Sequence, residues 1–208
     1  MKKTARRIFL LSPAHTGGQR GRLLLREEAR SDLAVRLRSE GAPLGEIFAF
    51  ISGLYFRGKL AYAGAFANPP EGLPGAFVIT AGRGLVPPET RIGIEELRRL
   101  ASVPIDAADA RYREPLERDC RTLHETAQPG CEYVLLGSVA TVKYIEPMAA
   151  ILGECLLFPE EFTGRGDMSR GGLMLRCARS GAELTYAALG NAARHGARPP
   201  KLPLERRR

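Results

Sequence analysis

Short apolar runs alternate with longer amphipathic stretches along this chain. Four runs rich in branched and aromatic residues, each ended by glycine, proline or serine, predict buried β-strands at residues 8–11, 76–79, 134–136 and 155–159. Between these runs, leucines and alanines recur at helical spacing among arginines and glutamates. Strands separated by helices are typical of a largely parallel sheet, so the pattern predicts an α/β protein.

The helical pattern is strongest at residues 20–40, 93–101, 113–127 and 142–153, with an interruption expected at Pro147. Residues 43–67 also favour a helix, although three glycines make its continuity doubtful. Near the end, 172–178 and 182–189 are two apolar runs joined by a short turn, which favours an antiparallel hairpin.

The predicted fold is a three-layer sandwich with a mainly parallel central sheet of about four strands and that C-terminal antiparallel hairpin. We expect residues 1–195 to form a single α/β domain. Residues 196–208 are expected to form a basic, flexible tail, because they carry prolines and arginines without a periodic apolar face.

Four polar, glycine-bearing loops follow the four predicted strands, at residues 12–20, 80–89, 137–141 and 161–172. The carboxyl ends of parallel strands lie at one edge of a sheet, and ligands bind beyond that edge. We therefore expect these loops to converge on a shared pocket.

Charge narrows the choice of partner. Lys and Arg outnumber Asp and Glu by 31 to 23, for a formal charge of +8. This balance favours phosphates, nucleic acid or an acidic membrane surface, while a merely solvated arginine-rich surface is the alternative. Residues 8–11 are too short an apolar run for a signal peptide core or a membrane span, so we expect a cytoplasmic protein that does not contact membranes.

Several function classes lose support because their motifs are missing from the sequence. The four cysteines form no CxxC pair, which gives no signal for a zinc site or a disulfide framework. The sequence also lacks a Walker motif, a dinucleotide fingerprint after the first strand and an HExxH motif. We therefore expect no cofactor and no metal, although magnesium held by Asp167 and a second carboxylate stays open. No feature of the sequence indicates an oligomeric state.

The stretch FTGRGDMSRGGLMLR, residues 162–176, combines four glycines with three arginines and an aspartate. Glycine lets backbone N–H groups approach an anion, and arginine suits phosphate oxygens. The predicted phosphate-binding residues here are Gly164, Arg165, Gly166, Ser169, Arg170 and Gly171. Asp167 is either a brace that pairs with an arginine and shapes the loop, or a catalytic or ligand-binding carboxylate.

The first loop contributes Ser12 and His15, which we expect to act with Asp167 as catalytic residues, His15 as a general base or ligand donor. A histidine that merely hydrogen-bonds within its loop is the alternative. The remaining predicted binding residues come from the other loops and from SGLYFRGKLAYA, and they are Thr80, Gly82, Gly84, Gly137, Ser138, Lys143, Tyr55 and Arg57.

Within SGLYFRGKLAYA, Tyr55 and Tyr62 are seven residues apart and share one face of a helix, either as core or as a surface on which bases stack. Arg57 and Lys59 are expected to point elsewhere.

The order of the segments IFLLSPAH, FVITAGRGLVPPE, VLLGSVATVKY and LLFPEEFTGRGDMSRGG resembles the uracil-DNA glycosylase superfamily. The second segment, with VPID downstream, is also similar to the glycosylase-like domain of archaeosine synthases. SGLYFRGKLAYA and GRGDMSRGG look like sequences of an uncharacterised bacterial family. These resemblances cover most of residues 8–190.

The resemblance implies a hydrolase that acts on a base or nucleoside, with the first loop positioning water and the last loop inserting into DNA. The chain departs from that pattern, because its first loop offers Ser12 and His15 instead of a carboxylate or amide, and its last loop has no histidine. We therefore expect a nucleotide- or nucleic-acid-directed protein, with a glycosylase-like hydrolase as one form. A non-catalytic nucleic-acid or polyanion-binding module is the main alternative, and a subunit that docks onto another protein is a third.

Overall fold

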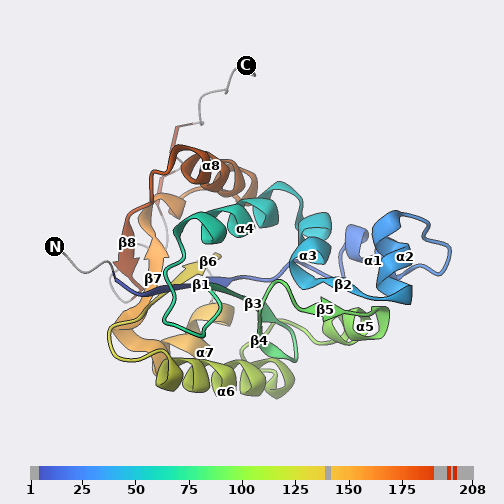
Figure 1. Cartoon of the computed structure of the whole chain (residues 1–208), viewed down its shortest axis with the longest axis horizontal. Coiled ribbons are helices and arrows are strands. Elements are labelled where there is room, and N and C mark those ends of the chain that lie inside the picture. Colours follow the sequence, from blue (N-terminus) through green and yellow to red (C-terminus); the bar gives the residue numbers. More distant parts are fainter. Residues whose placement is uncertain (1–4, 139–141, 190–195, 198, 201–208) are drawn as a thin grey trace.

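A mixed six-stranded sheet, mostly parallel, forms the centre of the protein (Figure 1). The computed structural model describes residues 5–138, 142–189, 196–197 and 199–200. The strand order is β4-β3-β1-β6-β7-β8. The four inner strands run parallel, and they are β3 (Ala76–Thr80), β1 (Arg7–Leu11), β6 (Glu132–Leu136) and β7 (Leu156–Pro159). The outer strands β4 (Gly84–Val86) and β8 (Tyr186–Ala188) are antiparallel to their neighbours.

Helices lie on both faces of this sheet, as Figure 1 shows. One face carries α4 (Leu54–Phe66) and α8 (Asp167–Ser180), and the other carries α6 (Ala110–Thr126) and α7 (Val142–Leu152). Covering both faces buries residues 8–11 of the central strand completely, which explains why that strand is a continuous apolar run without alternation. The α/β prediction and the four parallel strands are confirmed.

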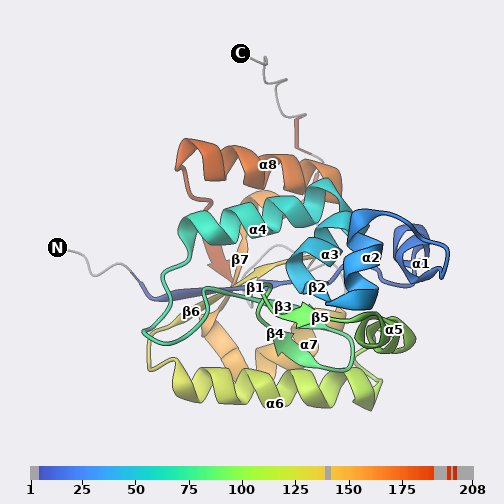
Figure 2. The same cartoon turned by 45° about the vertical axis from the view of Figure 1, so that its right-hand side comes forward.

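The remaining elements gather at one side of the sheet (Figure 2). They are α1 (Gln19–Leu25), α2 (Asp32–Ser39), α3 (Leu44–Ser52), α5 (Ile94–Ser102) and a small antiparallel sheet of β2 (Ala42–Pro43) and β5 (Arg91–Ile92). Short 3-10 turns at Gly153–Cys155 and Glu160–Phe162 flank β7.

Two helix predictions need correction, because each single helix is a pair of helices. Residues 20–40 divide into α1 and α2, and Ser31 starts α2 by accepting a hydrogen bond from the backbone N–H of Ala34 at 3.3 Å. Residues 43–67 divide into α3 and α4 at Gly53, whose φ of +61° is a left-handed conformation that glycine adopts without steric cost. Pro147, in contrast, lies inside α7 and does not interrupt it.

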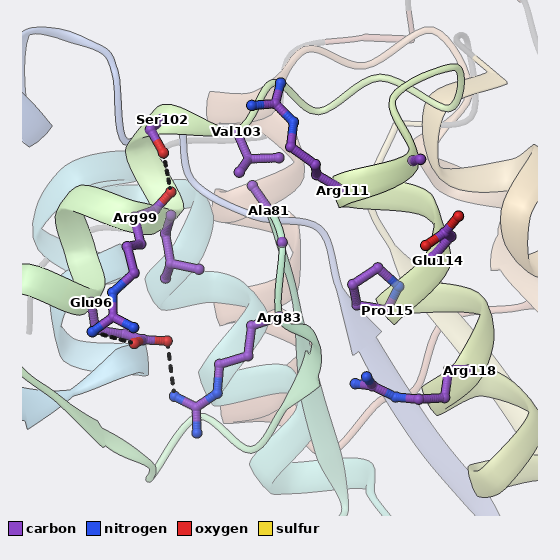
Figure 3. Close-up of a pocket in the computed structure, with 13 residues that line it drawn as sticks. Ala81, Arg83, Glu96, Arg99, Ser102, Val103, Arg111, Glu114, Pro115 and Arg118 are labelled. Carbon is purple, nitrogen blue, oxygen red and sulfur yellow. Dashed lines mark hydrogen bonds and ion pairs between the residues drawn. The ribbon is translucent and has the colours of Figure 1, made fainter.

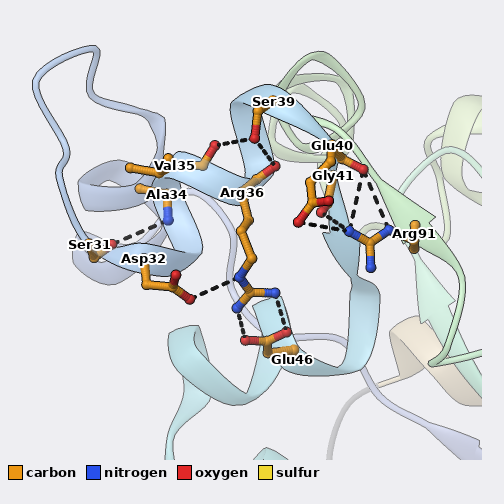
Figure 4. A network of polar contacts seen from close by, with 10 residues as sticks. All are labelled: Ser31, Asp32, Ala34, Val35, Arg36, Ser39, Glu40, Gly41, Glu46 and Arg91. Atoms are coloured by element: carbon orange, nitrogen blue, oxygen red, sulfur yellow. Dashed lines mark hydrogen bonds and ion pairs between the residues drawn. The ribbon is translucent and has the colours of Figure 1, made fainter.

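Polar contacts attach α2 to its surroundings (Figure 4). Arg36 pairs with Asp32 in its own helix at 2.9 Å and with Glu46 of α3. Arg91 of β5 donates to the backbone oxygen of Gly41 at 2.7 Å, after the end of α2. These groups are largely exposed, so the pairs orient α2 and add little to the free energy of unfolding.

The predicted C-terminal hairpin is wrong. Residues 167–180 form α8, which Gly181 ends in the left-handed conformation, and only the second run forms a strand, β8, paired with β7. Met174 and Cys177 are three residues apart and buried, the spacing of a helix, although the two glycines before them resemble a turn. The sheet also has more than about four strands, because β4 lies within the predicted second loop.

Helices α4 and α8 lie side by side (Figure 2) and touch at two glycines. A Cβ atom on Gly58 would lie 2.6 Å from the backbone oxygen of Gly171, and one on Gly171 would lie 2.8 Å from the Cα of Tyr55. The two helices therefore touch through their backbones. This contact places the first turns of both helices next to each other, beside the end of β1.

Tyr62 joins α4 to the C-terminal segment. Its buried hydroxyl accepts a hydrogen bond from the backbone N–H of Leu184 at 2.8 Å and shares a second with the Tyr186 hydroxyl at 2.6 Å.

We expect Tyr62→Phe to lower the free energy of unfolding by about 1–3 kcal/mol in urea titrations, because it leaves the buried Leu184 N–H without an acceptor. Tyr186→Phe is the control, since it removes the contact between the two hydroxyls and the Tyr186 bond to Glu183 but keeps the Leu184 bond. Equal losses in the two variants would contradict this assignment.

Candidate active site

Ser12 follows β1 directly and lies at the carboxyl edge of the sheet. Its backbone N–H donates to the carbonyl of Leu136 at 3.2 Å, which continues the pairing of β1 with β6. A Cβ atom on Gly137 would lie 2.8 Å from the Cβ of Ser12 and 3.1 Å from its Oγ. Gly137 thus leaves the space that the Ser12 side chain occupies, and two predicted site residues from different loops meet.

Lys59 extends from α4 to this serine. Its Nζ lies 2.7 Å from Ser12 Oγ and 2.8 Å from the Ser12 carbonyl oxygen. The same Nζ lies 4.0 Å from the centre of the Tyr55 ring and 5.3 Å from that of Phe56. Lys59 is 1% exposed and Ser12 is 4% exposed, so the amine and the hydroxyl meet out of contact with bulk water.

Burial lowers the pKa of Lys59 to about 7, because removing the ammonium from water is costly. Nearby charges act in opposite directions: the Asp167 carboxylate raises this pKa, and the Arg170 guanidinium lowers it. Near neutral pH a substantial share of Lys59 is therefore the neutral amine, which has a lone pair and can accept a proton.

Tyr55 completes the arrangement. Its side chain is 6% exposed, and its hydroxyl makes no hydrogen bond of normal geometry with any residue that the structure describes. Burial raises the pKa of Tyr55 to about 12. Arg170 and Ser12 partly offset this rise, so both residues lie near the phenol. Burial also raises the pKa of Tyr144 on α7, and Tyr55 and Asp167 contribute to this shift. We call Ser12, Tyr55 and Lys59 the edge centre.

A pocket of about 520 Å³ opens beside the edge centre. Three segments line it, namely the loop after β1, the residues from the end of α5 to Ile105, and the first turn of α7. Its polar side chains are His15, Thr16, Ser102, Lys143 and Tyr144. We call it the edge pocket. It brings two predicted site residues together, His15 and Lys143, and its wall includes Pro13, the neighbour of Ser12.

Two arginines of the stretch at residues 162–176 have partners within the protein. Arg170 is buried and donates from both Nε and Nη2 to the carbonyl of Phe162 at 3.2 Å, while its Nη1 lies 3.8 Å from Asp167. Arg165 donates to the carbonyl of Glu161 at 2.9 Å and to Ser169 Oγ at 3.2 Å. Both guanidinium groups therefore shape the entry to α8, which supports the brace hypothesis for Asp167.

The glycines of this stretch also have structural neighbours. Gly164 has a φ of +72°, and a Cβ there would lie 2.2 Å from the carbonyl oxygen of Ala197, so part of the predicted tail contacts this loop. Gly171 contacts α4, as described above. Gly166 precedes α8 and has open space around it. Asp167, in the first turn, is 67% exposed, and its negative charge suits the helix N-terminus.

Three further candidate residues lie away from the edge centre, in and beside the turn between β3 and β4. Thr80 is buried and donates to the carbonyl of Gly84 at 2.9 Å, which closes the turn between β3 and β4. Gly84 packs closely against α6, because a Cβ atom on Gly84 would lie 2.1 Å from a carboxylate oxygen of Asp119. Gly82 lines a separate cleft described below. Arg57 is exposed on α4, whereas Ser138 is half-buried directly after β6.

Lys59 is a candidate site residue that the sequence pattern does not predict. The pattern predicts that it points away from the Tyr55 and Tyr62 face, but it is buried on that face. Its position four residues after Tyr55 and three before Tyr62 is the signal that could have located it, because those spacings define one helix face. A buried lysine on an aromatic face is uncommon and marks a functional candidate.

A second cavity, of about 750 Å³, lies between the β3–β4 turn, α5 and α6 (Figure 3). Four arginines and two glutamates line it: Arg83, Arg99, Arg111, Arg118, Glu96 and Glu114. We call it the arginine cleft. The arginines are extensively exposed, although each also lies within 4 Å of a carboxylate. The arginine cleft and the edge pocket share Ser102 and Val103, so the two cavities adjoin.

Two further findings concern the described residues only. They contain no group of three histidine, cysteine or acidic side chains placed to hold a metal ion. None of their helices is long and apolar enough to cross a membrane. Among the cysteines, Cys120, Cys131 and Cys177 are buried as thiols, and burial raises the pKa of Cys131 to about 11.

Comparisons with protein-family models, with curated proteins and with solved structures give no match for this chain. The resemblance to the uracil-DNA glycosylase superfamily therefore stays a prediction. The case for a function depends on the edge centre, the edge pocket and the arginine cleft.

Proposed function

We propose that this chain is a nucleotide- or nucleic-acid-directed hydrolase. The observation that carries the proposal is the junction of a cleft lined by four arginines with a polar pocket at the carboxyl edge of a parallel sheet. In this arrangement, phosphates bind along the arginine cleft and the reacting part of the ligand enters the edge pocket. That division suits a polyanion with one reactive unit.

Electrostatics supports the first half of the proposal. The lining of the arginine cleft has four positive and two negative side chains, and the whole chain carries +8. Arginine guanidinium groups hold phosphate oxygens in pairs, and a positive cleft raises the local concentration of polyanions. Each arginine is paired at the rim, Arg83 and Arg99 with Glu96, and Arg111 and Arg118 with Asp109 and Asp119.

The glycosylase-like reaction is the second half of the proposal. This half assumes the three-layer sandwich of the superfamily that the sequence resembles. The helices on both faces of the sheet support that architecture. The edge pocket offers His15 and Ser102 to position water, and Lys143 beside Tyr144 to stabilise a departing base. Incubation with nucleosides, nucleotides and uracil-containing oligonucleotides, followed by chromatography for free base, tests this half.

We expect Arg99→Ala/Arg118→Ala to weaken binding of a fluorescein-labelled 20-nucleotide single strand about tenfold at 0.1 M salt, or about 1.4 kcal/mol. It should also reduce the steepness of the salt dependence by about 1.4, since each lost phosphate contact contributes about 0.7 for single strands. Fluorescence anisotropy at several salt concentrations measures both quantities.

The matched control is Arg98→Ala/Arg121→Ala. It removes the same charge from the same two helices, and neither arginine lines the arginine cleft. Equal losses in the two double variants would show that net charge alone governs binding. Absence of binding in the unsubstituted protein at 50 mM salt would remove the proposal.

A non-catalytic polyanion-binding module is the second candidate. The observation that favours it is Asp167, which is exposed and braced against Arg170. His15→Ala separates the two: the module retains its affinity and releases no base in either form, whereas the hydrolase loses base release with its affinity retained.

A further inference from the structure

We propose that Ser12 is a nucleophile, that Lys59 is its general base, and that together they cleave uncharged esters or amides through an acyl-enzyme. This activity goes beyond the nucleic-acid proposal, because it requires neither the arginine cleft nor a polyanion. It is carried by the contact between Lys59 Nζ and Ser12 Oγ, and by the unpartnered hydroxyl of Tyr55.

The geometry fits a serine activated by a neutral amine. Neutral Nζ has two N–H groups and one lone pair. One N–H donates to the Ser12 carbonyl oxygen at 2.8 Å, which fixes the amine, and the lone pair can face the hydroxyl proton of Ser12 across 2.7 Å. A nucleophile within hydrogen-bond distance of a base that a third group orients is the arrangement expected for covalent catalysis.

The surroundings keep Lys59 able to act as a base. Its amine faces the Tyr55 and Phe56 rings and has no direct carboxylate partner among the residues that the structure describes. The low pKa that results from burial agrees with this role. Two charged residues of α8 act on the pKa of Lys59 in opposite directions. Asp167 raises it and Arg170 lowers it, so their effects partly cancel.

The Tyr55 hydroxyl supplies a donor beside the pair. A buried O–H without a partner costs free energy that a bound ligand can recover, and developing negative charge on a carbonyl oxygen is such a ligand. The phenol lies near Ser12 and stays protonated through neutral pH, because burial raises its pKa to about 12.

The reaction proceeds in two balanced steps. Ser12 Oγ bonds to the carbonyl carbon and passes its proton to Nζ, and the leaving alcohol or amine takes that proton as the C–O or C–N bond breaks. Water then attacks the acyl carbon and gives a proton to Nζ, which returns it to Ser12 as the acid leaves.

An uncharged carbonyl suits this site better than a phosphoryl group. A phosphate dianion beside Nζ would favour the ammonium form of Lys59, which cannot accept the serine proton. We assign the edge pocket as the route to Ser12, because its wall includes Pro13, the next residue in the chain, although Ser12 itself is 4% exposed and does not line the pocket.

The test is covalent labelling of the full chain with an alkyl fluorophosphonate, an uncharged probe that reacts with activated serines. We expect peptide mapping to find the label on Ser12, with a rate that rises with pH through a midpoint near 7. Lys59→Met should lower the rate about 100-fold and abolish that midpoint, Ser12→Ala should abolish labelling at this position, and Ser39→Ala should leave it unchanged.

Folded protein that stays unlabelled at Ser12 between pH 6 and 9, or that is labelled equally fast in Lys59→Met, overturns the proposal. Ser12→Cys supplies a second measurement: alkylation of the introduced thiol by iodoacetamide in the native protein at pH 7, faster than that of the buried native cysteines, supports an activated and accessible position. If the introduced thiol is alkylated no faster than the buried native cysteines, the proposal is overturned. Labelling needs no nucleic acid, so it can succeed or fail independently of the nucleic-acid binding that anisotropy measures.

Discussion

Lys59→Met is expected to make the folded protein more stable than the unsubstituted chain below pH 7, and this advantage should disappear as the pH rises to about 9. Methionine fills nearly the same volume as lysine without bringing a charge into the core. The ammonium of Lys59 is 1% exposed, and its burial costs free energy whenever it is protonated.

The direction follows from the two pKa values of Lys59. In the unfolded chain it titrates near 10.5, and in the folded protein near 7, so between these values the unfolded state binds more protons. Stability therefore rises with pH across that window. At about 1.4 kcal/mol for each pKa unit, the full change is about 5 kcal/mol, present above pH 10.5 and lost as the pH falls to 7.

The other groups that face Lys59 are common to the two proteins. Asp167 and Arg170 approach from α8, Tyr55 from its own helix and Tyr144 from α7. Burial raises the pKa values of both tyrosines above 10, so each tyrosine lowers stability only as the pH rises above about 10, and it does so in both proteins, which cancels in their difference.

Urea titrations of both proteins between pH 6 and 10.5 measure the difference in the free energy of unfolding. The difference should favour Lys59→Met at pH 6 and reverse above about pH 9, where the neutral amine keeps two hydrogen bonds with Ser12. Lys143→Met is the control, since Lys143 is only partly buried, and its difference should be flat. Parallel curves for Lys59→Met would show that Lys59 is not neutralised by folding.

The parallel sheet could be predicted because a strand buried on both faces is a purely apolar run. Residues 8–11 and 134–136 are such runs, and each ends in a residue that starts a turn. Residues 167–180 could not be assigned in the same way. Gly171 is typical of a turn, but it is needed where α8 meets α4, and only the partner helix makes that need visible.

The site was partly predictable for a similar reason. Ser12, Gly137 and Tyr55 could be identified, because loops after parallel strands meet at one edge and Tyr55 belongs to an aromatic face. Lys59 could not, since a lysine beside apolar residues usually extends its amine into water. Its burial depends on the Ser12 carbonyl and hydroxyl, which lie 47 residues earlier in the chain.

Gly58→Ala is expected to lower the free energy of unfolding by about 2–3 kcal/mol, the range of overpacked cores. The new Cβ would lie 2.6 Å from the backbone oxygen and 2.9 Å from the Cα of Gly171, and backbone atoms cannot move aside as a flexible side chain does. The loss exceeds the roughly 1 kcal/mol that alanine contributes to a helix relative to glycine.

Gly64→Ala is a matched control, because it makes the same substitution in the same helix at an exposed position where a Cβ meets no atom within 4 Å. It should raise the free energy of unfolding by up to about 1 kcal/mol through helix propensity alone. Opposite signs for the two variants in urea titrations would establish the backbone contact between α4 and α8. A gain in both would contradict it.

Separation of the helices by Gly58→Ala also has a consequence at the edge centre. Asp167 and Arg170 lie in the first turn of α8, and their opposing effects on Lys59 depend on the distance that the two glycines set. If α8 moves outward, water reaches the amine and the folded-state pKa of Lys59 rises toward its ordinary value. The pH-dependent gain in stability between pH 7 and 10.5 should therefore shrink in Gly58→Ala and stay unchanged in Gly64→Ala.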